Sequence, residues 1–227
     1  NPFLYYSKMA AGAFIGKNPK NPMMPFRETI KIMIPLLISS LGITLAFKMK
    51  FWNIGAEGQM LVGGIATAFW MINFAGKMNI VMLFLCMAIS AIVAGGIWGL
   101  IPGFFKAKWN TNETLFTLMM NYIATQLAAY YIIVWEVPKG AGKIGIINQN
   151  TNAGWLPQIA GKQYLLTILV VAVMTVLTYI YLKYSKHGYE IAVVGESQRT
   201  ASYAGIKVER VIIRTMVLSG AMCGLMG

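Results

Sequence analysis

The sequence predicts an all-α fold, a polytopic bundle of transmembrane helices. Of 227 residues, 57% are hydrophobic and 11% are charged, and the mean hydropathy is +0.61. The apolar residues form blocks of the length that crosses a bilayer, about 20 residues, without amphipathic spacing. Lys and Arg flank these blocks, as is usual at membrane surfaces. This pattern excludes a soluble globular domain.

Six apolar blocks are long enough to be spans. The first has about eighteen residues, or about 27 Å of helix, with Pro35 near its expected start, where a helix tolerates proline best. We expect the third block to end at Pro102, because proline interrupts helices. The predicted spans are residues 30–47, 54–74, 80–101, 113–135, 164–182 and 211–227.

The two ends of the sequence indicate a piece of a longer protein. The sixth block reaches Gly227 without a polar flank, although a membrane helix cannot stop within hydrocarbon. Residues 1–27 contain no signal peptide with a charged n-region and a cleavage site. We expect residues 1–227 to form a single transmembrane domain that is truncated at both ends.

A polar and glycine-rich motif, FWNIGAEGQMLVGG, opens the second block at residues 51–64. Glu57 within hydrocarbon would cost several kcal/mol unless it faced protein or water, so we interpret it as functional. The glycines favour a broken or re-entrant helix, which membrane proteins tolerate where it is buried or lines a cavity. The alternative is that Glu57 caps the first helical turn at the interface.

The fourth block carries one polar and small face. Glu113, Thr117 and Asn121 follow at intervals of four residues, and Ala124 and Ala128 continue the same side. Asn121 would lie about 12 Å along the axis from Glu113. A buried amide there needs partners, either on another helix or in a solvated path, and both readings stay open.

Small residues also recur at intervals of four within two other blocks. They are Ala91, Gly95 and Gly99 in the third block, and Gly220 and Gly224 in the sixth. Such stripes allow close helix approach, so they predict a tightly packed bundle.

No residue pattern supports catalysis or a bound metal or cofactor. The single histidine, His187, has no Cys, His or Asp at ligand spacing, and Cys86 and Cys223 lie within apolar blocks. The string GAGKIG at 140–145 lacks the βαβ context of a dinucleotide site and the Ser or Thr of a P-loop. The net charge of +12 is spread over many short loops, which argues against nucleic acid binding.

The longest charged connection, residues 183–210, suggests an orientation. If this loop is cytoplasmic, alternation places Lys48, Lys50, Lys106 and Lys108 on the same side, as the positive-inside rule expects. The outer loops then carry Lys139, Lys143 and Lys162. The basic N-terminal segment, which would fall outside, counts against this assignment.

The same loop contains signals for a short helix. Ser197 can act as N-cap for a helix through about Ala204, with Gly205 as the stop. We expect bends at Gly188 and Gly195 before it. A short helix between two spans would offer a docking surface, whereas the alternative is an ordinary solvated loop.

Four strings, taken in order, resemble the permease subunits of bacterial ABC importers of the branched-chain amino acid and simple-sugar type. They are the motif at 51–64, IPGFFKAKWNTNETLFTLMMNYIA at 101–124, HGYEIAVVGESQRTASYAGIKVERV at 187–211 and LSGAMCGLMG at 218–227. The sequence is most similar to the nucleoside branch, linked to basic membrane lipoproteins, in which NIGAEGQ is characteristic.

The resemblance implies a multi-pass subunit of the bacterial cytoplasmic membrane without catalytic residues. Its partners would be a second permease subunit, ABC ATPase subunits that hydrolyse ATP, an extracytoplasmic substrate-binding lipoprotein and membrane lipid. Its cargo would be a nucleoside or related small polar solute, or alternatively a simple sugar. An ATP-independent secondary transporter or channel is a further alternative, because an intramembrane glutamate can relay protons.

The resemblance also assigns roles by position. The residues expected along the substrate path are Asn53, Glu57, Gln59, Asn112, Glu113 and Asn121. The residues expected to couple the permease to its ATPase are Gly188, Gly195, Ser197, Arg199, Ala201 and Gly205.

Overall fold

The computed structural model describes residues 2–14, 23–149, 151–157 and 164–227, and these form helices and connecting loops without a strand. The helices are α1 (Pro2–Phe14), α2 (Met24–Lys48), α3 (Ala56–Phe74), α4 (Ile80–Trp109), α5 (Glu113–Trp135), α6 (Leu165–Tyr184), α7 (Lys186–Glu196), α8 (Gln198–Tyr203) and α9 (Val208–Met226). The predicted all-α helical bundle is confirmed.

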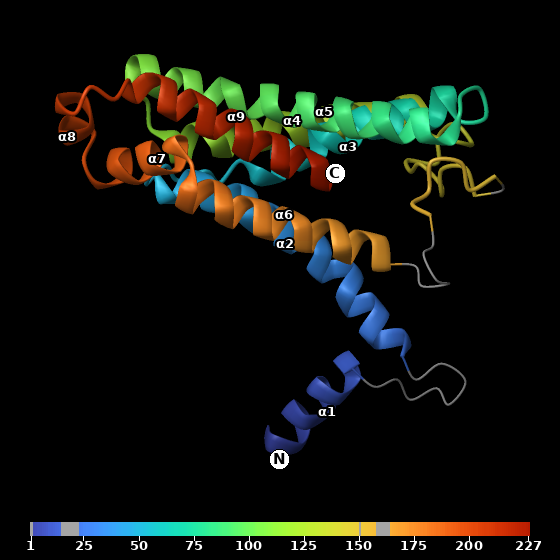
Figure 1. Cartoon of the computed structure of the whole chain (residues 1–227). Helices are drawn as coiled ribbons and strands as arrows, with labels where there is room; N and C mark the ends of the chain where they lie inside the picture. Colours follow the sequence, from blue (N-terminus) through green and yellow to red (C-terminus); the bar gives the residue numbers. More distant parts are fainter. Residues whose placement is uncertain (1, 15–22, 150, 158–163) are drawn as a thin grey trace.

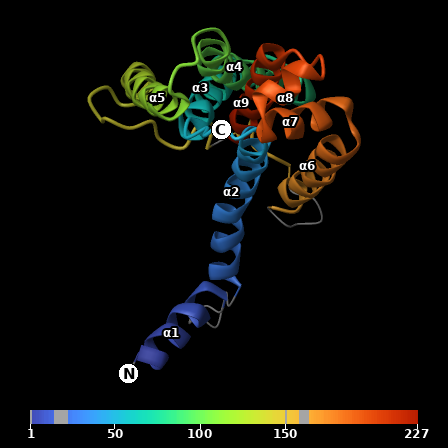
Figure 2. The ribbon, with the colours of Figure 1, turned by 90° about the vertical axis from the view of Figure 1, so that its left-hand side faces the viewer.

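Helices α4 and α9 form the centre of the bundle and lie side by side (Figure 1). Helices α2 and α3 pack against α9, α5 packs on α3, and α6 packs on α2. Figure 2 shows α1 and the first half of α2 projecting away from the packed helices. The α8 end of the bundle carries α7, α8 and the α4–α5 turn, and the loop that follows α5 lies at the opposite end.

The predicted glycine stripes meet where α4 crosses α9. A Cβ added to Gly95 would lie 2.4 Å from the Gly220 carbonyl oxygen, and one added to Gly99 would lie 2.5 Å from that of Met216. On α9, a Cβ at Gly224 would lie 2.4 Å from the Ala91 carbonyl oxygen. Only residues without a side chain allow the two backbones to come this close, so we call this contact the glycine seam.

All six predicted blocks are helical, and the block at 113–135 matches α5 at both ends. Among the described residues, four helices are long and apolar enough to cross a membrane: α2, α4, α5 and α6. Helices α3 and α9 fall outside that group because they include polar and charged residues such as Glu57, Gln59 and Arg214. Six spans therefore remains a prediction, while an integral membrane bundle is supported.

Two proline expectations were wrong. Helix α2 begins at Met24, so Pro35 lies inside it rather than near its start. Helix α4 continues through Pro102 to Trp109 and ends where Asn110 adopts φ 50°. The ring of Pro102 removes one backbone hydrogen bond, but packing of Gly99 and its neighbours against α9 holds the helix on both sides of it.

The connection between α6 and α9 contains more helix than predicted. Gly188 and Gly195 are not bends, because both lie inside α7. A Cβ at Gly188 would lie 2.4 Å from the Leu182 carbonyl oxygen, and one at Gly195 would lie 2.3 Å from that of Lys48. These two glycines allow α7 to pack directly against the ends of α6 and α2.

Candidate functional site

The helical structure is interrupted between α2 and α3. After α2, residues 51–55 are not helical, and α3 starts only at Ala56. Within α3 the helix is continuous, so the expected break lies before the helix and not inside it. Asn53 is 1% exposed, its Oδ1 accepts from Gly55 N at 3.0 Å, and its Nδ2 donates to Ser219 Oγ at 3.1 Å.

Asn121 on α5 joins the two sides of this interruption. Its Oδ1 accepts a hydrogen bond from Gly58 N at 2.9 Å, and its Nδ2 donates to the Ile54 carbonyl at 3.0 Å. Gly58 N belongs to the first turn of α3, where backbone N–H groups lack partners within the helix. Of the two readings of Asn121, the structure therefore shows interhelical hydrogen bonding.

The interruption lies inside the bundle and not at its end. Asn121 stands eight residues into α5, which places it about 12 Å from the start of that helix. Gln59, 1% exposed, faces Asn53 there with its Oε1 3.4 Å from Asn53 Nδ2. We call this group the polar break: Asn53, Gln59, Asn121 and Ser219 with the backbone of Ile54 and Gly58.

Glu57 lies beside the polar break but points away from it. Its side chain is exposed, and within the described part of the chain no hydrogen bond or ion pair reaches it. It occupies the first turn of α3, where the helix dipole favours a carboxylate. Within hydrocarbon an exposed carboxylate needs water or a protein partner, because contact with lipid would be costly.

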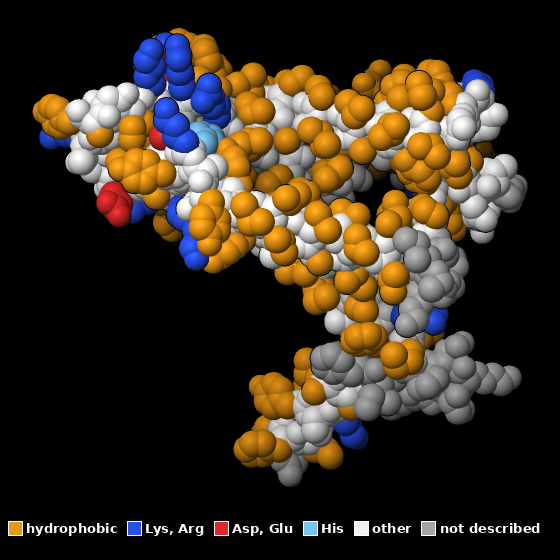
Figure 3. Space-filling view, in the orientation of Figure 1, with side chains coloured by type: hydrophobic (Ala, Val, Ile, Leu, Met, Phe, Trp, Pro, Cys, Tyr) orange, Lys and Arg blue, Asp and Glu red, His pale blue; other side chains and the backbone are white. Residues whose placement is uncertain are grey.

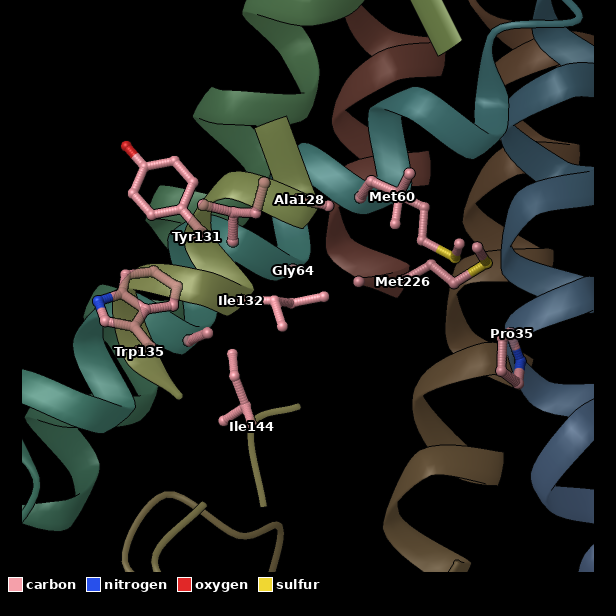
Figure 4. Close-up of a pocket in the computed structure, with 13 residues that line it drawn as sticks. Pro35, Met60, Gly64, Ala128, Tyr131, Ile132, Trp135, Ile144 and Met226 are labelled. Atoms are coloured by element: carbon pink, nitrogen blue, oxygen red, sulfur yellow. The ribbon is translucent and has the colours of Figure 1, made fainter. Parts of the chain in front are cut away.

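A cavity of about 380 Å³ opens along the same side of α3. Leu61, Gly64 and Ala68, which follow Glu57 at helical spacing, line it together with residues of α2, α5 and the end of α9 (Figure 4). Tyr131 and Trp135 of α5 add two rings whose centroids lie 4.9 Å apart. This volume lies within the usual range for small-molecule pockets.

Asn112 and Glu113 lie apart from the polar break, at the α8 end. Asn112 caps α5, since its Oδ1 accepts from Thr114 N at 3.1 Å and from Leu115 N at 3.2 Å. Glu113 forms an ion pair with Lys106 of α4 at 2.8 Å. The structure thus brings together three of the six predicted path residues and places Glu57 next to them.

Comparison with known proteins identifies the family. Residues 28–227 match the model of the family described as "Branched-chain amino acid transport system / permease component". The chain belongs to this family. No solved structure matches the chain.

Several curated permeases are similar to this family member over 88% of its length. The guanosine ABC transporter permease protein NupP of Bacillus subtilis is 36% identical, and the nucleoside ABC transporter permease protein NupB of Lactococcus lactis is 30% identical. The glucose ABC transporter permease protein TsgB13 of Haloferax volcanii is 29% identical. The chain spans 58%, 57% and 55% of the length of these three relatives, respectively.

The short helix predicted in the 183–210 loop of this permease-family chain is confirmed as α8. Ser197 caps it, with Oγ accepting from Thr200 N at 3.3 Å, and Gly205 follows it at φ +78°. Ala201 is fully buried in a core cluster with residues of α2, α7 and α9, whereas Arg199 is exposed and Tyr203 is 92% exposed. One face of α8, with Ala201, is thus packed on the bundle, and the other, with Arg199 and Tyr203, is exposed.

Sequence reasoning missed Ser219, Tyr131 and Trp135. Ser219 lies 166 residues from its partner Asn53, and a lone hydroxyl in an apolar block gives no sign of a distant amide. Tyr131 and Trp135 stand four residues apart on α5, which could have indicated a shared face, but aromatic residues near a span end also anchor it at the interface.

Proposed function

We propose that this chain is part of the transmembrane permease subunit of an ABC importer in the bacterial cytoplasmic membrane, and that its cargo is a nucleoside or a related small polar solute. The observation that supports the proposal is the polar break, together with the exposed Glu57 that lies one helical turn before the cavity-lining Leu61. Two of the relatives named above are guanosine and nucleoside permeases, which favours a nucleoside, and the glucose permease makes a simple sugar the alternative.

The chemistry of the cavity suits this class of cargo. The Tyr131 and Trp135 rings, which line the cavity, can stack on a base. The Glu57 carboxylate, one helical turn before the cavity-lining Leu61, can accept hydrogen bonds from ribose hydroxyls or base amino groups. In this proposal Asn53, Gln59 and Asn121 do not contact the cargo. Their side-chain amides instead hold the start of α3 in place through hydrogen bonds. In this proposal Asn112 and Glu113 brace the α8 end of the path.

The proposed partners are a second permease subunit, ABC ATPase subunits that hydrolyse ATP, and an extracytoplasmic substrate-binding lipoprotein. The α8 end would face the cytoplasm, and the exposed face of α8, with Arg199 and Tyr203, would meet the ATPase. Closure of the ATPases would move α8, and α7 would transmit the movement because Gly188 and Gly195 pack it directly on α6 and α2.

Uptake by the full-length protein in its complete assembly tests the cargo path. We expect Glu57→Gln to lower the uptake of labelled guanosine at least tenfold. Glu28→Gln is the matched control, since Glu28 is an exposed carboxylate on α2 that pairs with Lys31 on its own helix. Equal uptake by the two variants would contradict a role for Glu57 in the path.

The coupling role of α8 can be tested at Ala204. It is exposed, so a charge there leaves the core intact, whereas a charge at the buried Ala201 would disrupt folding. We expect Ala204→Glu to abolish ATP-driven uptake and to weaken co-purification of the ATPase. Thr151→Glu, at the opposite end, is the control. Normal uptake by Ala204→Glu would remove α8 from the coupling path.

A proton-driven carrier is the second candidate, and the exposed Glu57 carboxylate, which has no partner among the residues that the structure describes, favours it. The two candidates separate when the proton gradient and ATP are supplied independently to proteoliposomes. An importer of the ABC class requires ATP and the ATPase subunits, whereas a carrier would work with the gradient alone and would lose that ability in Glu57→Gln.

A further inference from the structure

A second cavity lies on the other side of the bundle and has no part in the proposed path. It is a groove of about 580 Å³ between α6 and α9, with the buried Leu45 of α2 as part of its floor. Met174 and Leu177 line it from α6, and Leu218 and Met222 line it from α9. The hydroxyl of Thr178, which also lines the groove, donates to the Met174 carbonyl of its own helix, so this part of the lining offers mainly apolar contact.

The dimensions of this α6–α9 groove match one leaflet of a bilayer. Its lining on α6 extends from Met174 to Tyr184, which corresponds to about 15 Å of helix rise. The hydrocarbon core of a bilayer is about 30 Å thick, so a single leaflet contributes about 15 Å. A groove of this length suits one acyl chain that lies parallel to the helices.

Positive charge gathers at the α8 end of the groove. Arg214 is exposed on α9, one turn before Leu218, and within the described residues it has no ion pair. Its guanidinium lies in electrostatic range of the Tyr181 hydroxyl and of His187. Figure 3 shows Lys and Arg side chains grouped at this end of the face that carries α6 and α9, whereas apolar side chains cover the rest of it.

The neighbouring groups leave this end positively charged overall. Lys183 donates to the Tyr179 hydroxyl and lies 5.4 Å from the ring centroid of Tyr184, which lines the groove. One carboxylate, that of Glu190, interacts electrostatically with Tyr181 and His187, as Arg214 does. The Nε2 atom of His187 is buried and without a partner among the described residues, while its Nδ1 contacts the Tyr181 hydroxyl.

We infer that the α6–α9 groove is a binding site for an anionic phospholipid, with one acyl chain between α6 and α9 and the phosphate headgroup at Arg214. Charge at one end and apolar side chains over one leaflet length complement such a lipid. A helix from another protein segment could also fill the groove, but an apolar helix would leave the positive charge at the α8 end of the groove without a partner. The inference depends on membrane insertion and is independent of which solute the protein carries.

Native mass spectrometry of the full-length protein tests the site, with phosphatidylglycerol and phosphatidylcholine of identical acyl chains as probes. We expect phosphatidylglycerol to be retained preferentially. Arg214→Gln should lower the phosphatidylglycerol-to-phosphatidylcholine ratio about fivefold, the effect of one basic residue beside an anionic lipid. Arg214→Lys should keep most of the preference, and Lys77→Gln, an exposed lysine at the opposite end, should keep all of it.

Two further measurements separate the lipid from other occupants. Met222→Trp should fill the groove and reduce retention of both lipids while the protein remains folded. Phosphatidylglycerol with a photoreactive acyl chain should label the peptides that contain residues 174–185 and 214–222. Equal retention of the two lipids by the unchanged protein would overturn the inference. Crosslinking of a cysteine at Leu218 to another protein segment, with no lipid labelling, would overturn it as well.

Discussion

The glycine seam and the polar break lie close together in the bundle, yet they are held by opposite means. At the seam, α4 and α9 are regular helices whose backbones touch because Gly95, Gly99 and Gly220 have no side chains. At the break, the backbone is irregular and its polar groups are satisfied by the side chains of Asn53 and Asn121. The first contact depends on shape and the second on hydrogen bonds.

The difference indicates which part of the bundle is fixed and which can change. Close packing of two backbones over several turns resists small deformations, so we interpret the seam as a frame. A few side-chain hydrogen bonds to an irregular backbone can be exchanged for others, as in the discontinuous helices of transporters. The polar break is therefore the better place for a conformational change, and the predictions below test this division.

The largest effect is expected at the glycine seam. Gly95→Ala places a Cβ 2.4 Å from the Gly220 carbonyl oxygen, so the two backbones must separate, at a cost of about 3 kcal/mol. The neighbouring Gly96→Ala is the matched control, because its Cβ would lie 3.6 Å from Val217 in ordinary contact. Thermal unfolding in detergent measures both variants. Equal stability of the two would mean that the seam is not the rigid frame.

A smaller loss is expected at the polar break. Asn121→Ala leaves Gly58 N and the Ile54 carbonyl without partners inside the bundle, which we expect to destabilise the protein by about 2 kcal/mol. Thr125→Ala, one turn further along α5, removes only a bond to the Asn121 carbonyl of the same helix. Unfolding of both variants by denaturant gives the comparison.

Transport distinguishes the two regions more sharply than stability does. In the proposed importer, Asn121→Ala should lower uptake by more than its loss of folded protein explains, since the start of α3 is no longer held. Gly95→Ala should lower uptake only in proportion to the folded protein that remains. If instead Gly95→Ala lowers uptake by more than its loss of folded protein explains, and Asn121→Ala does not, the conformational change involves the seam and not the polar break.

The small faces of the seam were predictable from sequence, and so was part of the polar break. Small residues at intervals of four fix which face of a helix is small, and they predicted close packing, but they did not show that α4 and α9 pair with each other. The motif at 51–64 indicated irregular backbone at membrane depth. Its bonding partners could not be derived, because Asn121 and Ser219 lie 63 and 166 residues away from their partners Gly58 and Asn53.

Helix ends were predicted well where a cap marks them and poorly where packing decides. Asn112 and Ser197 each accept hydrogen bonds from backbone N–H groups of the helices that they precede, and α5 and α8 begin as expected. Pro102 failed as an end and Gly188 as a bend, because contacts with other helices outweigh local preference. Local chemistry therefore predicted the helix ends that are set by a cap, whereas packing between helices set the others.

The smallest effect is expected in the loop after α5, where the chemistry of the polar break recurs outside the spans. Both oxygens of the Glu136 carboxylate accept backbone hydrogen bonds, from Gly140 N and Gly142 N, each at 2.7 Å. These bonds lower the pKa of Glu136 below its ordinary value of 4.5, and nearby Lys139 lowers it further. The stabilisation is thus fully present above pH 4.5 and is lost as the pH falls through the lowered pKa.

Hydrogen exchange measures this loss directly. After correction for the intrinsic rate, protection of the Gly140 and Gly142 amides should fall at acidic pH, and Glu136→Gln should reduce it already at neutral pH. The Val81 amide, bonded to the neutral Asn79 side chain at the same end of the bundle, should show no such dependence. The amide bonds of Asn121 do not titrate either, so the polar break should keep its protection over the same pH range. Parallel loss at both sites would mean that the break opens with the loop and is not held independently by α5.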